Sequence, residues 1–140
     1  MINDQSAGKV REDEGRTRRS PCPVACALDI FGDRWSLLVI RDLLLGKTRF
    51  KDFIASPEGI PTNILSERLS RLSAAGLVRQ VTLAEGARHL GYGLTAKGRA
   101  LLPVLGAMRD WGLRWEKGTQ VMKGLHRPAS RGRSPGQLPE

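Results

Sequence analysis

The chain has 140 residues, which is enough for one domain with tails but too few for two separate cores. Its 23 basic and 14 acidic side chains give a net charge of +9. A sequence pI of about 10.6 is typical of nucleic-acid-binding domains, although an anionic membrane surface or an acidic protein partner would also suit it. No apolar run approaches the roughly 18 residues of a membrane span, and residues 1–20 lack the apolar core of a secretory signal, so we expect a cytoplasmic protein.

The excess positive charge lies mainly in the middle of the chain. Residues 47–99 carry nine basic and four acidic side chains, which supplies more than half of the net charge of +9. A basic tail attached to a neutral domain would show the opposite distribution. The charge therefore favours an anionic partner that is bound by the folded part of the chain.

The first twenty residues are charged and poor in large apolar side chains, so we expect residues 1–20 to be a disordered tail. Its three arginines form either an arm that touches phosphate or simply part of a solvated tail; they are Arg16, Arg18 and Arg19. A first helix is predicted from Pro23 to about Phe31, because Pro is favoured in a first turn and Gly32 is suited to end the helix.

A second helix is predicted from Arg34 to Leu45, with Asp33 as its N-cap and Gly46 as its terminator. Apolar side chains cover most of its circumference, so this helix should be central and mostly buried. Residues 47–48 leave room only for a stub of strand beside a later hairpin. A short helix over residues 49–55 should then bury Phe50, Phe53 and Ile54.

The next predicted helix is amphipathic. Residues 56–59 have the composition of a type I turn, Ile60 should fill the core, and the helix should run from Thr62, its N-cap, to Gly76. Its apolar arc contains Ile64, Leu65, Leu69, Leu72 and Ala75, and its polar side contains Asn63, Ser66, Glu67 and Ser70. Any surface helix shows such a pattern, so the context has to decide what the polar side does.

The residues after this helix predict a β-hairpin. Residues 77–83 and 90–94 are strand-like, residues 84–89 form the tip, and Gly91 and Gly93 weaken the return strand. A helix, a turn, a helix and a hairpin in this order make a winged helix, in which the second helix of the pair enters a major groove. We therefore predict a mainly α protein with a small β-hairpin (α+β), a winged helix-turn-helix that binds double-stranded DNA.

A long helix should follow from Ala96 to about Lys117, capped by Thr95 and kinked at Pro103. It has more apolar positions than its own domain can cover, so we expect a homodimer. The residues expected in the dimer interface are Leu101, Leu105, Met108, Trp111 and Trp115. Residues 118–140 are rich in Pro, Gly, Ser and Arg and should be a second disordered tail, which leaves residues 21–117 as the domain.

Two sets of side chains make up the predicted DNA site. The base-reading set contains short hydrogen-bonding side chains at the start of the amphipathic helix: Thr62, Asn63, Ser66, Glu67 and Ser70. The set expected on phosphates or in the wing is Arg49, Lys51, Arg71, Arg88 and His89.

Two charged side chains of the same helix keep more than one role. Glu67 either accepts a hydrogen bond from a cytosine amine or repels the phosphates of a duplex that is bound in the wrong register. Arg68 lies near the apolar arc, where it reaches a phosphate or, as we favour, pairs with an acidic side chain such as Asp42 or Asp52.

Six blocks of the sequence occur together with a characteristic spacing. They are CPV at 22–24, GDRW at 32–35, RFKDF at 49–53, GIPTNILSERL at 59–69, AGLV at 75–78 and YGLTAKG at 92–98. In these blocks the chain resembles the HxlR-type transcriptional regulators over roughly residues 21–117. The resemblance implies a bacterial homodimeric winged helix whose N- and C-terminal helices form the dimer interface. The chain departs from the family at Gly91 and Gly93, where the family usually has side chains.

The sequence contains no catalytic or cofactor motif that we recognise. No His lies near a Cys, no Gly-rich phosphate loop or H-E-x-x-H motif occurs, and Cys22 and Cys26 are one residue too far apart for a C-x-x-C motif. The two cysteines and the distant His89 and His126 do not make a zinc set. We therefore expect no enzyme, no metal and no cofactor.

Cys22 is a candidate redox sensor. At a helix N-terminus its thiolate would gain from the helix dipole, and Arg18 and Arg19 would add to this effect. An inert side chain packed against the dimer partner is the alternative. The resemblance implies that some relatives respond to oxidants, quinones or aldehydes through a Cys at this position, so the expected effector is a small electrophile or oxidant. A protein-interaction module on the same dimeric fold, without DNA binding, is the rival function.

Overall fold

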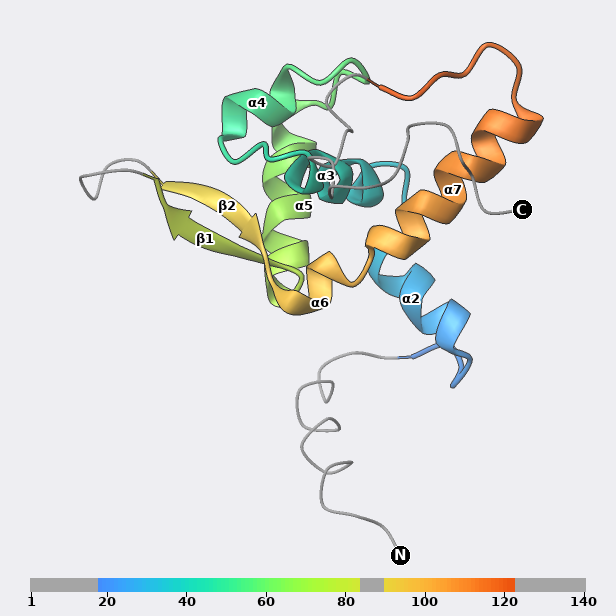
Figure 1. Ribbon diagram of the computed structural model, residues 1–140. Helices are drawn as coiled ribbons and strands as arrows, with labels where there is room; N and C mark the ends of the chain where they lie inside the picture. Colours follow the sequence, from blue (N-terminus) through green and yellow to red (C-terminus); the bar gives the residue numbers. More distant parts are fainter. Residues whose placement is uncertain (1–17, 84–89, 123–140) are drawn as a thin grey trace, which may run out of the picture. The chain divides into compact units, whose positions relative to one another are not determined.

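The computed structural model of the chain describes residues 18–83 and 90–122 (Figure 1). The chain divides into two units, with the boundary in the sequence between Asp33 and Arg34. In residues 18–33 the only helix is α2 (Pro23–Phe31), which has the predicted bounds. Gly32 is the C-cap of this helix, and a Cβ there would lie 2.4 Å from the carbonyl oxygen of Leu28, so this position requires a glycine. That oxygen instead accepts the N–H of Gly32 at 2.7 Å.

The second unit is built around α3 (Ser36–Leu44), which is central and buried as predicted but begins two residues later than Arg34. The prediction of Asp33 as the N-cap was wrong, because residues 33–35 form a bend and turn, and Trp35 takes the N-cap position. The carbonyl oxygen of Trp35 accepts the N–H of Val39 at 3.0 Å. Gly46 follows the helix with a φ of 94°, a conformation that favours glycine, as predicted.

The short helix α4 (Phe50–Ile54) buries Phe53. Its caps are Arg49 and Ala55, the first and last residues of the predicted helix. Residues 47–48 form no strand, so that prediction was wrong in detail. The carbonyl oxygen of Thr48 nevertheless accepts the N–H of Tyr92 at 2.8 Å, which ties this segment to the hairpin. The turn after α4 closes as predicted, with the N–H of Gly59 donating to the carbonyl oxygen of Ser56 at 3.1 Å.

Helix α5 (Thr62–Ala74) contacts α3 and α4 through its apolar side. Leu65, Leu69 and Leu72 are at most 2 % exposed. The N-cap is Pro61 and not Thr62, because the carbonyl oxygen of Pro61 already accepts the helical N–H of Leu65 at 2.9 Å. The C-terminal end agrees with the prediction, since α5 stops just before Gly76, whose φ is 78°.

Strands β1 (Val78–Thr82) and β2 (Leu90–Leu94) form the predicted antiparallel hairpin, with Val78 opposite Leu94. Its predicted tip, residues 84–89, lies outside the described residues. Gly91 is buried, and a Cβ there would lie 2.5 Å from Cδ1 of Leu83 and 2.8 Å from the carbonyl oxygen of Thr48. Glycine at this position therefore lets Thr48 approach β2 closely.

Two helices replace the single kinked helix that the sequence predicted, namely α6 (Ala96–Arg99) and α7 (Leu102–Trp115). Thr95 caps α6 as predicted, because its Oγ1 accepts the N–H of Gly98 at 3.1 Å. Pro103 has no N–H to bond to the carbonyl oxygen of Arg99, and it lies in the first turn of α7, where proline is tolerated. The helix therefore breaks instead of bending.

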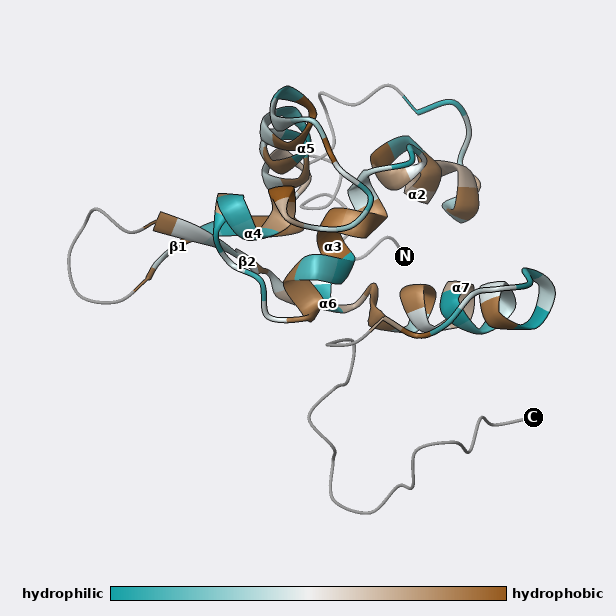
Figure 2. Cartoon of the chain, turned by 90° about the horizontal axis from the view of Figure 1, so that it is seen from above, coloured by the Kyte–Doolittle hydropathy of each residue, from teal (hydrophilic) through white to brown (hydrophobic). Residues whose placement is uncertain are grey.

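The described elements are mainly helical and include one two-stranded antiparallel hairpin, in the order of a winged helix-turn-helix. This agrees with the predicted mainly helical winged helix-turn-helix with a small β-hairpin. Among the described residues, no helix is long and apolar enough to cross a bilayer. Hydrophobic residues recur along α7 among hydrophilic ones (Figure 2), and none of its residues is buried.

Candidate nucleic-acid interface

The outer side of α5 is polar and exposed over its whole length. Asn63, Ser66, Glu67 and Ser70 are exposed, and so is Thr62 in the first turn. The opposite side is buried against the core, so the polar side of the helix faces solvent. Amide, hydroxyl and carboxylate groups on an exposed helix are the groups that pair with base edges in a major groove. The structure thus brings together all five predicted base-reading residues.

Ion pairs on α5 engage the carboxylate of Glu67. It pairs with the guanidinium of Arg68, and one of its oxygens lies 3.8 Å from Nη1 of Arg71. Arg68 therefore forms an ion pair, as favoured from the sequence, although its partner Glu67 was not among the acidic residues suggested there. Arg71 keeps 44 % of its side chain exposed beside this pair.

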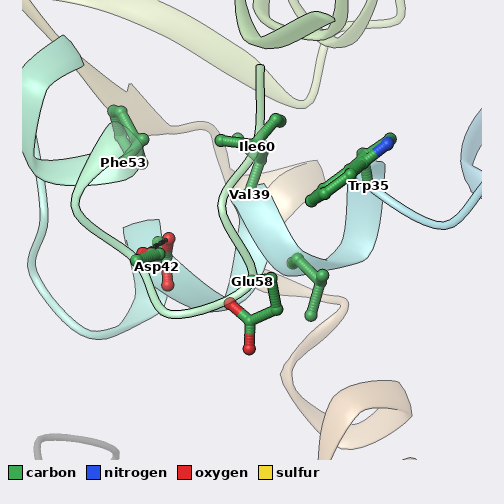
Figure 3. Close-up of a pocket in the computed structure, with 8 residues that line it drawn as sticks. Trp35, Val39, Asp42, Phe53, Glu58 and Ile60 are labelled. Carbon is green, nitrogen blue, oxygen red and sulfur yellow. Dashed lines mark hydrogen bonds between the residues drawn. The ribbon is translucent and has the colours of Figure 1, made fainter. Parts of the chain in front are cut away.

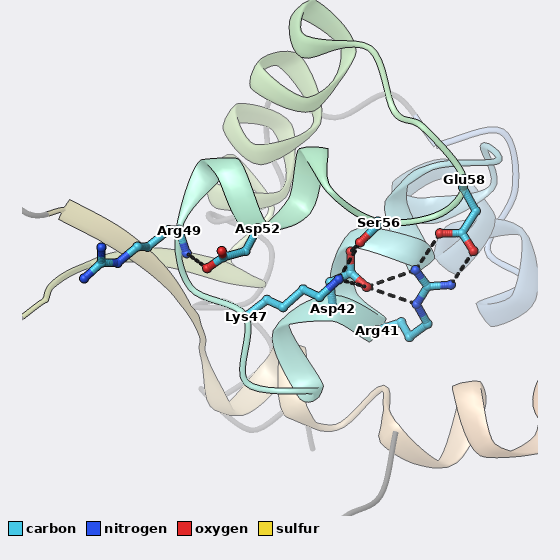
Figure 4. A network of polar contacts seen from close by, with 7 residues as sticks. All are labelled: Arg41, Asp42, Lys47, Arg49, Asp52, Ser56 and Glu58. Atoms are coloured by element: carbon cyan, nitrogen blue, oxygen red, sulfur yellow. Dashed lines mark hydrogen bonds and ion pairs between the residues drawn. The ribbon is translucent and has the colours of Figure 1, made fainter. Parts of the chain in front are cut away.

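Of the other four residues that were predicted to contact phosphates or to lie in the wing, two are in the part of the chain that the structure describes. Arg49 and Lys51 are exposed at the start of α4. The carboxylate of Asp52 accepts the backbone N–H of Arg49 at 3.4 Å, and the Arg49 guanidinium points away from that carboxylate (Figure 4). Arg88 and His89 lie outside the described residues.

A partly buried polar network, which was not predicted from the sequence, holds the turn before α5 against α3 (Figure 4). The carboxylate of Asp42, which is 3 % exposed, accepts from the Ser56 hydroxyl at 2.5 Å and from Nη2 of Arg41 at 2.9 Å. Arg41 also donates to both carboxylate oxygens of Glu58, at 2.9 and 2.7 Å. Lys47 donates to the Ser56 hydroxyl at 2.7 Å. These bonds fix the approach of the chain to α5.

The contact between Arg41 and Glu58 shifts the pKa of both groups. The hydrogen bond from Arg41 lowers the pKa of Glu58, although partial burial opposes this. The hydrogen bond to Glu58 raises the pKa of Arg41, and Asp42 raises it further against the effect of burial. The sequence signal that would have indicated the network is Asp42 itself, a carboxylate within the mostly apolar helix α3.

The other end of α5 is fastened by residues that follow the hairpin. Oγ1 of Thr95 donates to the carbonyl oxygen of Gly76 at 2.5 Å, and Nζ of Lys97 donates to that of Ala75 at 2.8 Å. These bonds satisfy the carbonyl groups of the C-cap residue Ala75 and of Gly76 after it. Both ends of α5 are therefore held, so the polar side keeps a fixed orientation.

A small cavity lies between α3, α4 and the turn before α5, lined in part by Trp35, Phe53 and Ile60 (Figure 3). Its volume of about 10 Å³ is close to the minimum needed for one water molecule. It is therefore too small for an organic effector.

A larger open hollow separates α5 from the hairpin, with a volume of about 450 Å³. Its hairpin side contains Arg79, Gln80 and Tyr92, and its helix side includes Ser73. None of these four was predicted as a site residue, because the sequence does not reveal that the hairpin folds back beside α5.

Helix α2 carries the candidate redox residue. Cys22 is exposed at the N-cap position, and its N–H donates to Oγ of Ser20 at 3.2 Å. Sγ of Cys26 donates to the carbonyl oxygen of Ser20 at 3.3 Å. Arg19, which was expected to assist Cys22, forms an ion pair with Asp29 at 2.6 Å. In the described part of the chain, no group of three or more His, Cys, Asp or Glu side chains is arranged to hold a metal ion.

The predicted interface residues in α7 and at its N-cap are unevenly exposed. Met108, Trp111 and Trp115 are 52 %, 60 % and 62 % exposed, whereas Leu101 and Leu105 are half-buried. Exposed tryptophans on one helix are unusual for a surface that faces only water.

Comparison with known proteins places this geometry in a family. Residues 30–120 match the HxlR-like helix-turn-helix family. The uncharacterized HTH-type transcriptional regulator YvaP of Bacillus subtilis is 37 % identical over 89 residues, which are 64 % of this chain and 82 % of YvaP.

Solved structures agree with this match. The crystal structure of PA1607 superposes on this chain with a TM-score of 0.67 and 39 % sequence identity, over 84 % of this chain and 85 % of PA1607. The reduced form of the transcriptional regulator YodB from B. subtilis superposes with a TM-score of 0.59 at 31 % identity, over 72 % of this chain and 100 % of that one. YodB has also been solved bound to quinone and after treatment with diamide. Because the family match covers more than half of the sequence, the chain belongs to the HxlR-like helix-turn-helix family and is a transcriptional regulator of the helix-turn-helix type.

Proposed function

We propose that the chain acts as a homodimer that reads a palindromic operator with the outer side of α5. The observation that carries this proposal is the fixed, exposed polar side of a helix that is buried on its other side and held at both ends. Asn63 and Ser66 contact base edges, since an Asn amide has the donor and acceptor pair that matches adenine. Thr62, Glu67 and Ser70 complete the reading surface.

Basic side chains around α5 hold the duplex without reading its sequence. Arg49 and Lys51 precede α5, and Arg71 lies on its outer edge; all three are exposed. Arg88 and His89 belong to this set on the sequence pattern alone. Contacts with phosphates give salt-dependent affinity, because each neutralised phosphate releases counterions.

The dimer forms through the terminal helices, α2 and α7. The exposed Met108, Trp111 and Trp115 of α7 support this, because a second copy would remove a large apolar area from water. A two-fold axis then presents two α5 helices to successive major grooves, with half-sites roughly 34 to 36 Å apart. A footprint with dyad symmetry at this spacing is the expected result.

The test of DNA reading is binding at two salt concentrations. A duplex selected from a random library and a scrambled duplex are titrated in a gel shift with the wild-type protein. We expect tighter binding to the selected duplex and a steep loss of affinity with salt on both duplexes. Binding that is absent, or that does not depend on salt, would instead favour a protein-interaction module on the same fold.

We also propose that Cys22 makes DNA binding sensitive to electrophiles or oxidants. Its exposure at the N-cap of α2 supports this, and so do the quinone-bound and diamide-treated structures of YodB. Treatment with diamide should release the wild-type protein and the Cys26→Ser control from the selected duplex, whereas Cys22→Ser should stay bound. Equal release of all three would remove Cys22 from this role.

A further inference from the structure

The open hollow between α5 and the hairpin has two walls that face each other. Ser66, Ser70 and Ser73 line it from α5, at positions that lie on one side of a helix. Arg79, Gln80 and Tyr92 line it from the hairpin, where Gln80 is directly opposite Tyr92 in the strand register. Helix α5 contacts β1, so the two walls belong to one packed arrangement (Figure 1).

The lining is chemically suited to an oxyanion. None of its seven residues is acidic, and its polar residues are three serines, Tyr92, Gln80 and Arg79. Within residues 18–83 and 90–122, no ion pair engages Arg79. The cross-strand neighbour of Arg79 is Gly93, which has no side chain to cover the guanidinium. A phosphate can therefore meet a cation and several donors at once.

The walls of the hollow are held in place before any ligand arrives. The N–H of Tyr92 is bonded to the carbonyl oxygen of Thr48 at 2.8 Å, and its ring meets Phe53 edge-on at a centroid distance of 6.3 Å. Lys97 and Thr95 fasten the end of α5 nearest the hairpin. Preorganised donors lose little freedom on binding.

The hollow is also continuous with the surface that reads DNA. Ser66 and Ser70 belong to both, so a phosphate in the hollow lies directly beside a duplex whose bases face Asn63. From this arrangement we propose that the hollow seats one phosphodiester of the DNA backbone per half-site, with Arg79 as its cation. The assignment rests on the proposed function and adds Ser73, Arg79, Gln80 and Tyr92 to the interface.

The experiment neutralises single phosphates and single residues in one scheme. The selected duplex is prepared with one methylphosphonate at a time and bound to the wild type, Arg79→Gln, Tyr92→Phe and Lys117→Gln. Lys117→Gln is the matched control, because it removes one positive charge from an exposed residue outside the hollow.

We expect one position per half-site at which methylphosphonate weakens wild-type binding about tenfold, as for a charge-assisted hydrogen bond. Arg79→Gln should weaken binding to the unmodified duplex by a similar factor, lower the salt slope by about one, and show no further loss at that position. Tyr92→Phe should keep the ring contact and lose a smaller part of the affinity. Lys117→Gln should behave like the wild type.

Two results would overturn the seat while leaving the proposed function intact. In the first, the wild type binds the selected duplex specifically, but every methylphosphonate weakens binding of Arg79→Gln as much as it weakens binding of the wild type. In the second, inorganic phosphate at constant ionic strength displaces the duplex from the wild type but not from Arg79→Gln. The hollow would then bind a free anion and not a phosphodiester of the duplex. Failure of the wild type to prefer the selected duplex would instead overturn the proposed function itself.

Discussion

The Asn63 side chain lies at the start of α5 on its exposed side, where its amide can meet a base edge. Asn63→Ala should cost roughly 1 to 3 kcal/mol on the selected duplex and much less on a scrambled one, because only base contacts depend on sequence. Fluorescence anisotropy on both duplexes measures this difference. Lys51→Gln is the comparison, and it should weaken both duplexes alike. Equal losses on both duplexes for Asn63→Ala would remove α5 from the groove.

Glu58 links stability to pH through its bond with Arg41. Since its pKa is lowered in the folded protein, its contribution is fully present above the pKa of an unfolded glutamate and is lost as pH falls through the lower folded value. Glu58→Gln should lower the unfolding free energy at neutral pH by roughly 1 kcal/mol, because Glu58 is partly exposed. It should also flatten the acid dependence in urea unfolding. Glu116→Gln, at an exposed residue, is the control. An unchanged acid slope in Glu58→Gln would show that the pair does not stabilise the fold.

At the scale of elements, the contact between α6 and the start of the hairpin requires a glycine. A Cβ on Gly98 would lie 2.2 Å from the carbonyl oxygen of Leu77 and 2.9 Å from Cδ2 of Leu94. Gly98→Ala should therefore destabilise the protein by roughly 1 to 3 kcal/mol, although alanine is the better helix former. Thermal and urea unfolding measure the loss. A gain in stability would mean that α6 does not pack as closely as the structure indicates.

The elements that the sequence predicted well are those whose signals are local. Pro23 and Gly32 bound α2, the leucine spacing of α5 indicated its buried side, and Gly76 marked its end. The start of α3 was missed because an Asp that can cap a helix does not reveal the turn that follows it. The break at Pro103 was predicted only as a kink, because proline removes a bond in either case.

In the candidate site, too, the residues that the sequence predicted are those with a local signal. The polar side of α5 follows from periodicity alone, so its residues could be named in advance. The Arg41, Asp42 and Glu58 network and the hollow at Arg79 and Tyr92 join segments that are distant in sequence. Such contacts depend on the packing of α3 against the turn and of the hairpin against α5, which no single stretch of sequence encodes.

At the scale of the whole molecule, α7 should hold two copies of the chain together at micromolar concentration. Trp111→Glu should give a monomer, because it places a charge among the exposed apolar residues of α7 that we expect to face the second copy. Light scattering behind size-exclusion chromatography measures the mass. Leu90→Glu, at a hairpin residue that is 56 % exposed against 60 % for Trp111, should leave the dimer intact. A monomer mass for the wild type would refute the dimer.

The bonds from Thr95 and Lys97 to the end of α5 also bear on how fast the chain folds. They close loops of only 19 and 22 residues, so they can form early at a small loss of chain entropy. We expect α5, the hairpin and α6 to form the folding nucleus. Thr95→Val, which removes the bonds to Gly76 and from Gly98, should then slow refolding more than it speeds unfolding in stopped-flow chevrons. A change confined to the unfolding limb would place the nucleus elsewhere.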